Sequence, residues 1–223
     1  ASAPTAPVTG GGVPFLDVEP LPDYSRFGEI EKVPLRSIRR KIARRMTTSA
    51  IMAPHVYHMD EADITDLDAL RRDLRAELTK EHGKDDPRTK LTTLAFLTKA
   101  VAKGLREVPE YNASIDVVRE EIVYKKFVNV GVAVAAPQGL VVPVIRNADQ
   151  LSVVEIAAGI VDLATRARKN ELDATEFQGG SFTITNMGAL GGTNAIPMIN
   201  YPEVGILAMA TAQEKPVVRD GRI

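Results

Sequence analysis

Apolar residues recur at helical intervals near the start of the chain. Leu35, Ile38, Ile42 and Met46 follow one another at spacings of 3, 4 and 4 residues, which places them on one face of a helix. The positions between them hold arginines and lysines. The pattern therefore predicts a basic amphipathic helix over residues 36–46.

Three further helices are indicated by periodicity and by their end signals. A leucine repeat runs between Thr65, which can cap its start, and Gly83, which can end it. Residues 92–108 are predicted to be helical up to Pro109. The sequence Ser152-Val-Val-Glu155 is a capping box and opens the fourth helix.

Strands are predicted in the gaps between these helices. Residues 127–135 alternate valines with small or polar residues, so another layer can pack closely on the small face. Pro143 implies an edge or a bulge in the next strand. The predicted strands are residues 122–124, 127–135, 140–145, 181–185 and 204–210. Because helices and strands interleave without a regular repeat, we expect an α/β (α+β) fold with a mixed sheet and packed helices.

Composition excludes several classes of function. The 223 residues carry 28 Lys and Arg against 29 Asp and Glu, so no global field favours nucleic acid or an anionic membrane. The basic helix lacks interleaved aromatic residues, which favours a solvated or intersubunit face over nucleic-acid binding. The absence of Cys excludes disulfides, thiolate metal sites and a cysteine nucleophile. No apolar run suggests a membrane span, and we expect a soluble intracellular protein.

The two ends differ from the rest of the chain. Residues 1–20 are dominated by Ala, Pro and Gly, which predicts a linker ahead of one domain over residues 21–223. Asp220-Gly221 is a hairpin signal only two residues from the last one. Since a strand is rarely left unpaired, we expect either that the domain lacks its C-terminal end or that a neighbouring chain supplies the second strand.

The most unusual stretch for chemistry is a polar strand end beside glycines. Thr185 and Asn186 run into Gly188, Gly191 and Gly192, and such glycines allow close approach of a ligand or another chain. A neutral hydroxyl at this point suits stabilisation of a developing oxyanion. The alternative is an ordinary strand-end turn.

The three histidines do not form a convincing metal site. His55 and His58 are three apart in a strand-like context, where they would point to opposite faces. His82 and Asp86 lie in a polar loop that favours solvent exposure. We interpret all three as structural or surface residues and expect no metal.

Several longer segments together resemble a known family. They read P-L-P-D-Y-S-R-F-G, I-A-R-R-M, P-H-V-Y-H-M-D-E-A-D-I-T, V-P-E-Y-N-A-S, N-V-G-V-A-V-A-A-P-Q-G-L-V-V-P-V-I-R-N-A-D, E-F-Q-G-G-S-F-T-I-T-N-M-G and I-N-Y-P-E-V-G-I-L-A. In this order they resemble the catalytic domain of the dihydrolipoamide acyltransferases, the E2 cores of 2-oxo acid dehydrogenase complexes. The first and last segments are most like the acetyl-transferring branch of the pyruvate dehydrogenase complex, and branched-chain acyl cores remain an alternative.

The resemblance implies a fold similar to chloramphenicol acetyltransferase, with trimers assembled into a large core. Each active site would lie between two subunits and would transfer an acetyl group from S-acetyl-dihydrolipoamide to CoA. Thr185 falls on the family's Ser/Thr that hydrogen-bonds the oxyanion. The family's general base, a histidine in D-H-R-x-x-D-G, has no counterpart in these residues, so we expect the 223-residue chain alone to be impaired. A noncatalytic scaffold component is the remaining alternative.

The resemblance also implies partners. The lipoyl group would be carried on a separate domain, E1 and E3 components would bind through upstream domains, and neither nucleic acid nor membrane is expected. Arg71, Arg72 and Arg75 are candidates for the CoA phosphates, although a solvated helix face explains them equally well. The location would be the cytoplasm in a bacterium or the mitochondrial matrix in a eukaryote.

Overall fold

The computed structural model describes residues 20–35, 37–188, 191–218 and 221. The predicted linker therefore lies, apart from Pro20, outside the described residues. Residues 216–218 are not in a strand, and the predicted second strand of the terminal hairpin falls on residues that are not described.

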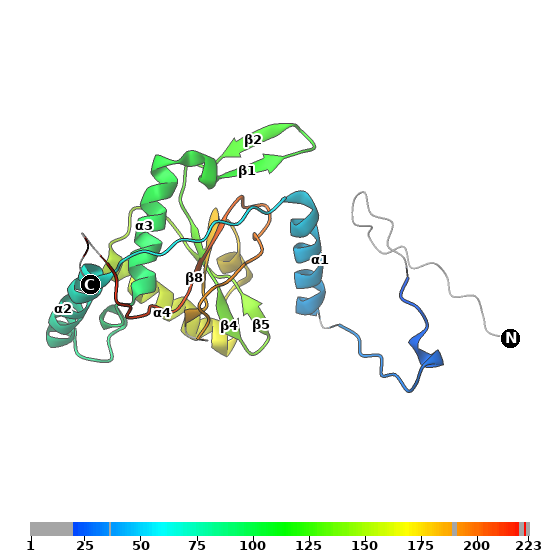
Figure 1. The fold of residues 1–223 in the computed structure, drawn as a ribbon, viewed down its shortest axis with the longest axis horizontal. Coiled ribbons are helices and arrows are strands. Elements are labelled where there is room, and N and C mark those ends of the chain that lie inside the picture. Colours follow the sequence, from blue (N-terminus) through cyan, green and yellow to red (C-terminus); the bar gives the residue numbers. More distant parts are fainter. Residues whose placement is uncertain (1–19, 36, 189–190, 219–220, 222–223) are drawn as a thin grey trace.

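Within the described ranges, most of the helical structure is in four α-helices: α1 (Ser37–Met52), α2 (Thr65–His82), α3 (Thr93–Glu107) and α4 (Val153–Lys169). Short 3-10 turns precede or connect them: η1 (Tyr24–Arg26), η2 (Pro87–Thr89), η3 (Pro109–Asn112) and η4 (Ala174–Phe177). Helices α1 and α2 lie on opposite sides of the central sheet region, and residues 20–35 extend beyond α1 (Figure 1).

The central sheet is mixed, as the sequence predicts. Its strand order is β6-β3-β7-β8, with β3 antiparallel to β6 and parallel to β7, and with β7 parallel to β8. The bounds are β3 (Val130–Val132), β6 (Val144–Ile145), β7 (Phe182–Asn186) and β8 (Ile206–Met209). Two separate hairpins pair β1 (Ala113–Asp116) with β2 (Glu121–Tyr124), and β4 (Val134–Ala136) with β5 (Gly139–Val141).

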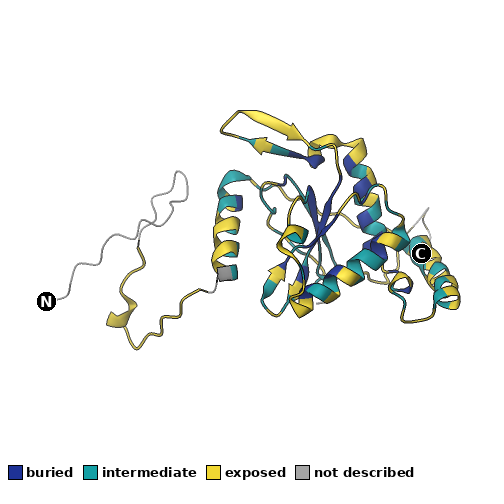
Figure 2. Ribbon diagram, turned by 180° about the vertical axis from the view of Figure 1, so that it is seen from behind, coloured by how far each residue is buried: buried dark blue, intermediate teal, exposed yellow. Residues whose placement is uncertain are grey.

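The main core joins this sheet to α3 and α4. Ile156 of α4, Leu105 of α3 and Ile184 of β7 all belong to one buried cluster. Figure 2 shows the buried residues concentrated in the central strands and on parts of both helices. The sheet is therefore anchored from one side by two amphipathic helices, and burial of their apolar faces supplies the main stabilisation.

The helix predictions are confirmed except at some ends. Helix α4 begins with the complete capping box of Ser152 and Glu155, and Gly83 ends α2 with a positive φ. Thr65 is not the cap of α2 but its first helical residue. Ile64 occupies the cap position, and the Asp63 carboxylate accepts from the Thr65 backbone N–H at 2.9 Å. Helix α1 continues to Met52, beyond the predicted Met46.

The predicted strand over residues 127–135 is wrong as one strand. It divides into β3 and β4, and Ala133 between them donates to the Ile184 carbonyl at 2.9 Å. Its small face is closely approached at Gly131, where a Cβ would lie 2.7 Å from Val142 Cγ1 and 3.1 Å from Thr183 Oγ1 of the paired strand β7, rather than against a further layer. Pro143 separates β5 from the edge strand β6. Strand β1 has no counterpart among the predicted strands.

Residues 20–35 and the β1–β2 hairpin project from the body of the molecule (Figure 1). Residues 20–35 are exposed throughout, and every residue of β2 is exposed. Within the described residues, no helix combines the length and the apolar character needed to cross a membrane.

Candidate functional site

Thr185 lies near the C-terminal end of β7, a strand that has parallel neighbours on both sides. It pairs with Ala208 of β8, directly after the fully buried Ile184 pairs with Val132 of β3. Thr185 itself is only partly buried. Because side chains alternate along a strand, Thr183 and Thr185 project from the same face of the sheet.

The two hydroxyls on that face have different surroundings. Thr183 is 1% exposed, and its Oγ1 donates to Oε2 of Glu203 at 2.6 Å. Within the described residues, the hydroxyl of Thr185 has no hydrogen-bond partner. One hydroxyl therefore belongs to the internal structure, whereas the other is available to a molecule that approaches the strand end.

The glycine-rich turn after β7 is held by the chain itself. Asn186 Oδ1 accepts from the Gly188 N–H at 2.9 Å, and Thr211 Oγ1 donates to the carbonyls of Gly188 and Gly192 at 3.2 and 3.1 Å. A Cβ on Gly188 would lie 3.1 Å from the Ala210 carbonyl oxygen. At Gly188 the close approach is therefore made by another part of this chain. The Asn186 side chain stabilises the turn through its bond to the Gly188 N–H.

Glu203 is a buried carboxyl group that the sequence analysis did not single out. It is 4% exposed, and its Oε1 accepts from Asn200 Nδ2 at 2.9 Å. Burial raises the pKa of the Glu203 carboxyl to about 7, while the hydrogen bonds and the positive charges of Lys125 and Arg45 oppose that rise. The available signal was an acidic residue placed directly before the apolar run of β8.

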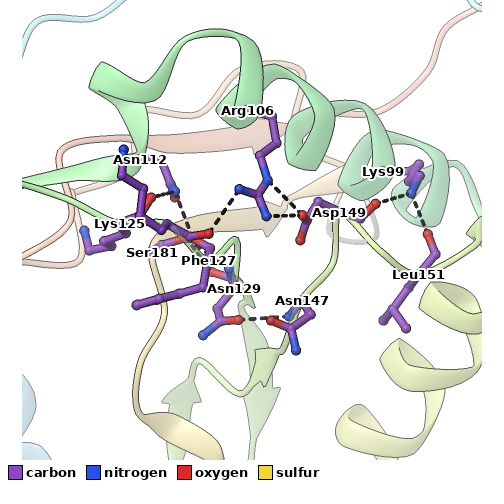
Figure 3. Close-up of polar contacts among 11 residues, drawn as sticks. Lys99, Arg106, Asn112, Lys125, Phe127, Asn129, Asn147, Asp149, Leu151 and Ser181 are labelled. Carbon is purple, nitrogen blue, oxygen red and sulfur yellow. Dashed lines mark hydrogen bonds and ion pairs between the residues drawn. The ribbon is translucent and has the colours of Figure 1, made fainter.

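A second polar network secures the segment that leads into β3 (Figure 3). Arg106 of α3 donates through Nε to Asp149 at 2.8 Å and through Nη1 to the Lys126 carbonyl at 3.0 Å. Asn112 donates to the carbonyls of Lys125 and Phe127, both at 2.9 Å. Each bond fixes a backbone or side-chain oxygen close to the core, so the network is structural.

His55 and His58 occupy structural and surface positions, as interpreted from the sequence, whereas His82 is not in an exposed loop: it is the last residue of α2, and its side chain is only 20% exposed. Nε2 of His55 accepts from the Ile199 N–H at 2.9 Å, whereas the His58 side chain is 87% exposed beside Asp60. His82 contacts Glu81. The described residues contain no group of three or more His, Cys, Asp or Glu side chains arranged to hold a metal ion.

The three candidate arginines lie on α2, away from β7. Arg71 bonds to Asp68 and to the Leu91 carbonyl, and Arg72 also pairs with Asp68. These hydrogen bonds hold the pKa of the Asp68 carboxyl below its ordinary value. An open hollow on this helix is lined by Arg71, Arg72, Arg75, Ala76, Thr79 and Lys80. No β7 residue lines it, so the structure does not join these arginines to Thr185.

Comparison with known sequences gives a consistent result. The dihydrolipoyllysine-residue acetyltransferase component of the Haemophilus influenzae pyruvate dehydrogenase complex is 39% identical over 221 residues, which cover 97% of this chain and 38% of that protein. The lipoamide acyltransferase component of a Pseudomonas putida branched-chain alpha-keto acid dehydrogenase complex is 40% identical over 200 residues, covering 90% of this chain and 46% of that protein. The chain thus spans less than half the length of these relatives.

Solved structures agree with the sequence comparison. One comes from a study of a serine, a histidine and an asparagine in the catalytic mechanism of the Azotobacter vinelandii dihydrolipoamide acetyltransferase, and another is the cubic core of the pyruvate dehydrogenase multienzyme complex. Each has a TM-score of 0.82 and 40% identity, and the match covers 93% of this chain and 82% of theirs. Residues 27–223 match the model of the 2-oxoacid dehydrogenases acyltransferase catalytic domain. The chain therefore belongs to the 2-oxoacid dehydrogenase acyltransferase family.

Proposed function

We propose that this domain transfers an acetyl group from S-acetyl-dihydrolipoamide to CoA, as part of the core of a pyruvate dehydrogenase complex. The observation that carries the proposal is the hydroxyl of Thr185, which is partly exposed at a strand end and has no partner within the described residues. The relatives named for pyruvate dehydrogenase complexes support the choice of an acetyl group.

The chemistry requires a proton acceptor and an oxyanion donor. A free thiol has a pKa near 8.5, so a base must take its proton for attack on the thioester at neutral pH. Attack of the CoA sulfur at the carbonyl carbon gives a tetrahedral adduct with a negatively charged oxygen. The Thr185 hydroxyl donates a hydrogen bond to that oxygen. Collapse of the adduct breaks the C–S bond to dihydrolipoamide and forms acetyl-CoA, and the departing dihydrolipoamide sulfur takes back the proton that the base removed from CoA. The base is the histidine of the family's D-H-R-x-x-D-G motif, which none of the 223 residues supplies.

The test measures acetyl-CoA formation from S-acetyl-dihydrolipoamide by the full-length protein that contains this chain. Thr185→Ala should lower kcat strongly and leave KM for CoA nearly unchanged, because the hydroxyl acts on charge present only in the transition state. Ser152→Ala serves as a control, because Ser152 is the exposed cap of α4 and lies outside β7 and the turn that follows it. An unaltered kcat in Thr185→Ala would remove this residue from the mechanism.

A branched-chain acyl group is the second candidate, favoured by the Pseudomonas putida relative. Acetyl- and isobutyryl-dihydrolipoamide are offered to the same protein, and kcat/KM is compared. We expect a higher value with the acetyl donor, and the reverse order would assign the chain to branched-chain transfer. Activity with neither donor would support a noncatalytic scaffold.

We also propose that the domain forms trimers, with the lipoyl domain as the partner that delivers the acyl group and the E1 and E3 components attached through other domains. The similarity to a cubic core supports self-assembly. Large apolar side chains exposed on two projecting segments support contacts with other subunits, because a partner would remove them from water. On residues 20–35 they include Leu21, Phe27 and Val33, and on the β1–β2 hairpin they include Ile115, Val118, Ile122 and Val123. Sedimentation equilibrium tests the expected trimer against a monomer.

A further inference from the structure

The loop Ile199–Glu203 is gripped by segments distant in sequence. Ser49 of α1 donates to the Ile199 carbonyl, and Arg45 of the same helix donates to the Tyr201 carbonyl at 3.2 Å. Ser114 of β1 donates to the Pro202 carbonyl at 2.6 Å. With the bond from the Ile199 N–H to His55, three separate parts of the chain fix a loop that ends three residues before Ile206, the first residue of β8.

Glu203 connects this loop to the strand that carries Thr185. Its carboxyl oxygens accept from Thr183 of β7 at 2.6 Å and from Asn200 of the loop at 2.9 Å. Asn200 Nδ2 also lies 3.4 Å from Thr183 Oγ1. The three side chains therefore form a closed set, which we call the Glu203 clamp.

The clamp lies next to the proposed oxyanion donor along two paths. Thr183 lies two residues before Thr185 on β7, so both side chains project from the same face of the sheet. Glu203 also lies just before β8 in the chain, and Ala208 of that strand pairs with Thr185. A shift of β7 against the loop that leads into β8 therefore breaks the bond between Thr183 and Glu203 and moves the strand that carries Thr185.

We propose that Glu203 is a positioning residue of the acyl-transfer site, which holds the end of β7 in register with β8 so that the Thr185 hydroxyl points at the developing oxyanion. The inference rests on the proposed function of Thr185. Glu203 does not touch the reacting atoms. It acts through Thr183 and the β7–β8 pairing.

The clamp accommodates both protonation states of its carboxyl group. The ionised group accepts from Thr183 and Asn200. The protonated group can donate to the Thr183 oxygen while its other oxygen still accepts from Asn200. The charged groups that act on it are Lys125 and Arg45. A glutamine, which is neutral and similar in shape, should therefore preserve the positioning.

The first arm measures activity in the full-length protein. Glu203→Ala should lower kcat by up to about 100-fold with little change in KM for CoA, as expected when a reacting group is displaced. Glu203→Gln should restore most of kcat. Glu176→Ala is the matched control, because Glu176 also accepts two side-chain bonds, from Arg166, but joins α4 to η4. An equal kcat loss in Glu203→Ala and Glu176→Ala, or no rescue by glutamine, would overturn the proposal.

The second arm does not depend on activity. Amide hydrogen exchange in the 223-residue chain should quicken at residues 185–187 and 206–209 in Glu203→Ala, and remain slow there in Glu203→Gln and Glu176→Ala. Unchanged exchange at these residues would overturn the clamp. Faster exchange together with full activity of Thr185→Ala would instead refute the proposed function and leave the clamp intact.

Thr183→Val provides a milder variant in case Glu203→Ala does not fold. It removes one of the two bonds to the carboxyl group and keeps the shape of the side chain. We expect a several-fold loss of kcat and faster exchange at residues 185–187. If Thr183→Val leaves both measurements at the wild-type level, the proposal is wrong.

Discussion

Replacing Glu203 by glutamine should remove a distinct pH dependence from the stability of the fold. Burial raises the pKa of the Glu203 carboxyl to about 7 from its ordinary 4.5. The folded protein therefore holds this proton more tightly than the unfolded chain does. The stabilising contribution is fully present below about pH 4.5 and is lost as the pH rises through about 7.

The size of the effect follows from the same two pKa values. Each pH unit between them corresponds to about 1.36 kcal/mol, so the wild-type protein should lose roughly 3 kcal/mol of unfolding free energy from this group between about pH 4.5 and pH 8. Glu203→Gln cannot titrate and should not lose it. The difference in unfolding free energy between the two proteins should therefore change by roughly that amount across the window.

Urea unfolding, followed by circular dichroism at fixed protein concentration, measures this difference at several pH values. Glu176→Gln is the control, because the bonds from Arg166 hold the pKa of the Glu176 carboxyl below its ordinary value, so it stays ionised in this window. Its pH profile should run parallel to the wild type. If Glu203→Gln also runs parallel to the wild type, the buried carboxyl does not titrate as described.

Two further predictions concern packing and helix ends. Gly131→Ala should lower the unfolding free energy by about 1–3 kcal/mol in urea unfolding, because its Cβ would lie 2.7 Å from Val142 Cγ1; an unchanged midpoint would show that Val142 moves aside. Ser152→Ala should cost about 0.5–2 kcal/mol, because it removes the side-chain bond to the Glu155 N–H at 3.2 Å. A melting temperature within error of the wild type would contradict the role of this cap.

Several helix ends that are determined by neighbouring residues were predicted correctly from the sequence. The capping box at Ser152 and the stop at Pro109 act through neighbouring residues, so the start of α4 and both ends of α3 match the sequence within a residue or two. The division of residues 127–135 into β3 and β4 depends on Ile184, about fifty positions away, which takes the Ala133 N–H. Alternation of valines alone carries no information about such a distant partner.

The candidate site was predictable only in part for the same reason. Thr185 stood out because a polar strand end precedes glycines in the sequence. The different roles of Thr183 and Thr185 depend on Glu203, which lies twenty residues beyond Thr183. Likewise, the role of His55 follows from Ile199 rather than from the nearby His58. The two threonines, and the two histidines, are distinguished by hydrogen bonds to residues distant in the sequence and not by their residue type.

The central claim is that the Thr185 hydroxyl stabilises the charged adduct of acyl transfer. Single-turnover acetyl transfer to CoA in the full-length protein tests it most directly, with Thr185→Val, which keeps the side-chain shape, compared with Thr185→Ser, which keeps the hydroxyl. We expect Thr185→Val to slow the chemical step by about 10²–10³-fold, and Thr185→Ser to stay close to the wild-type rate. Equal rates for valine and wild type would contradict the account.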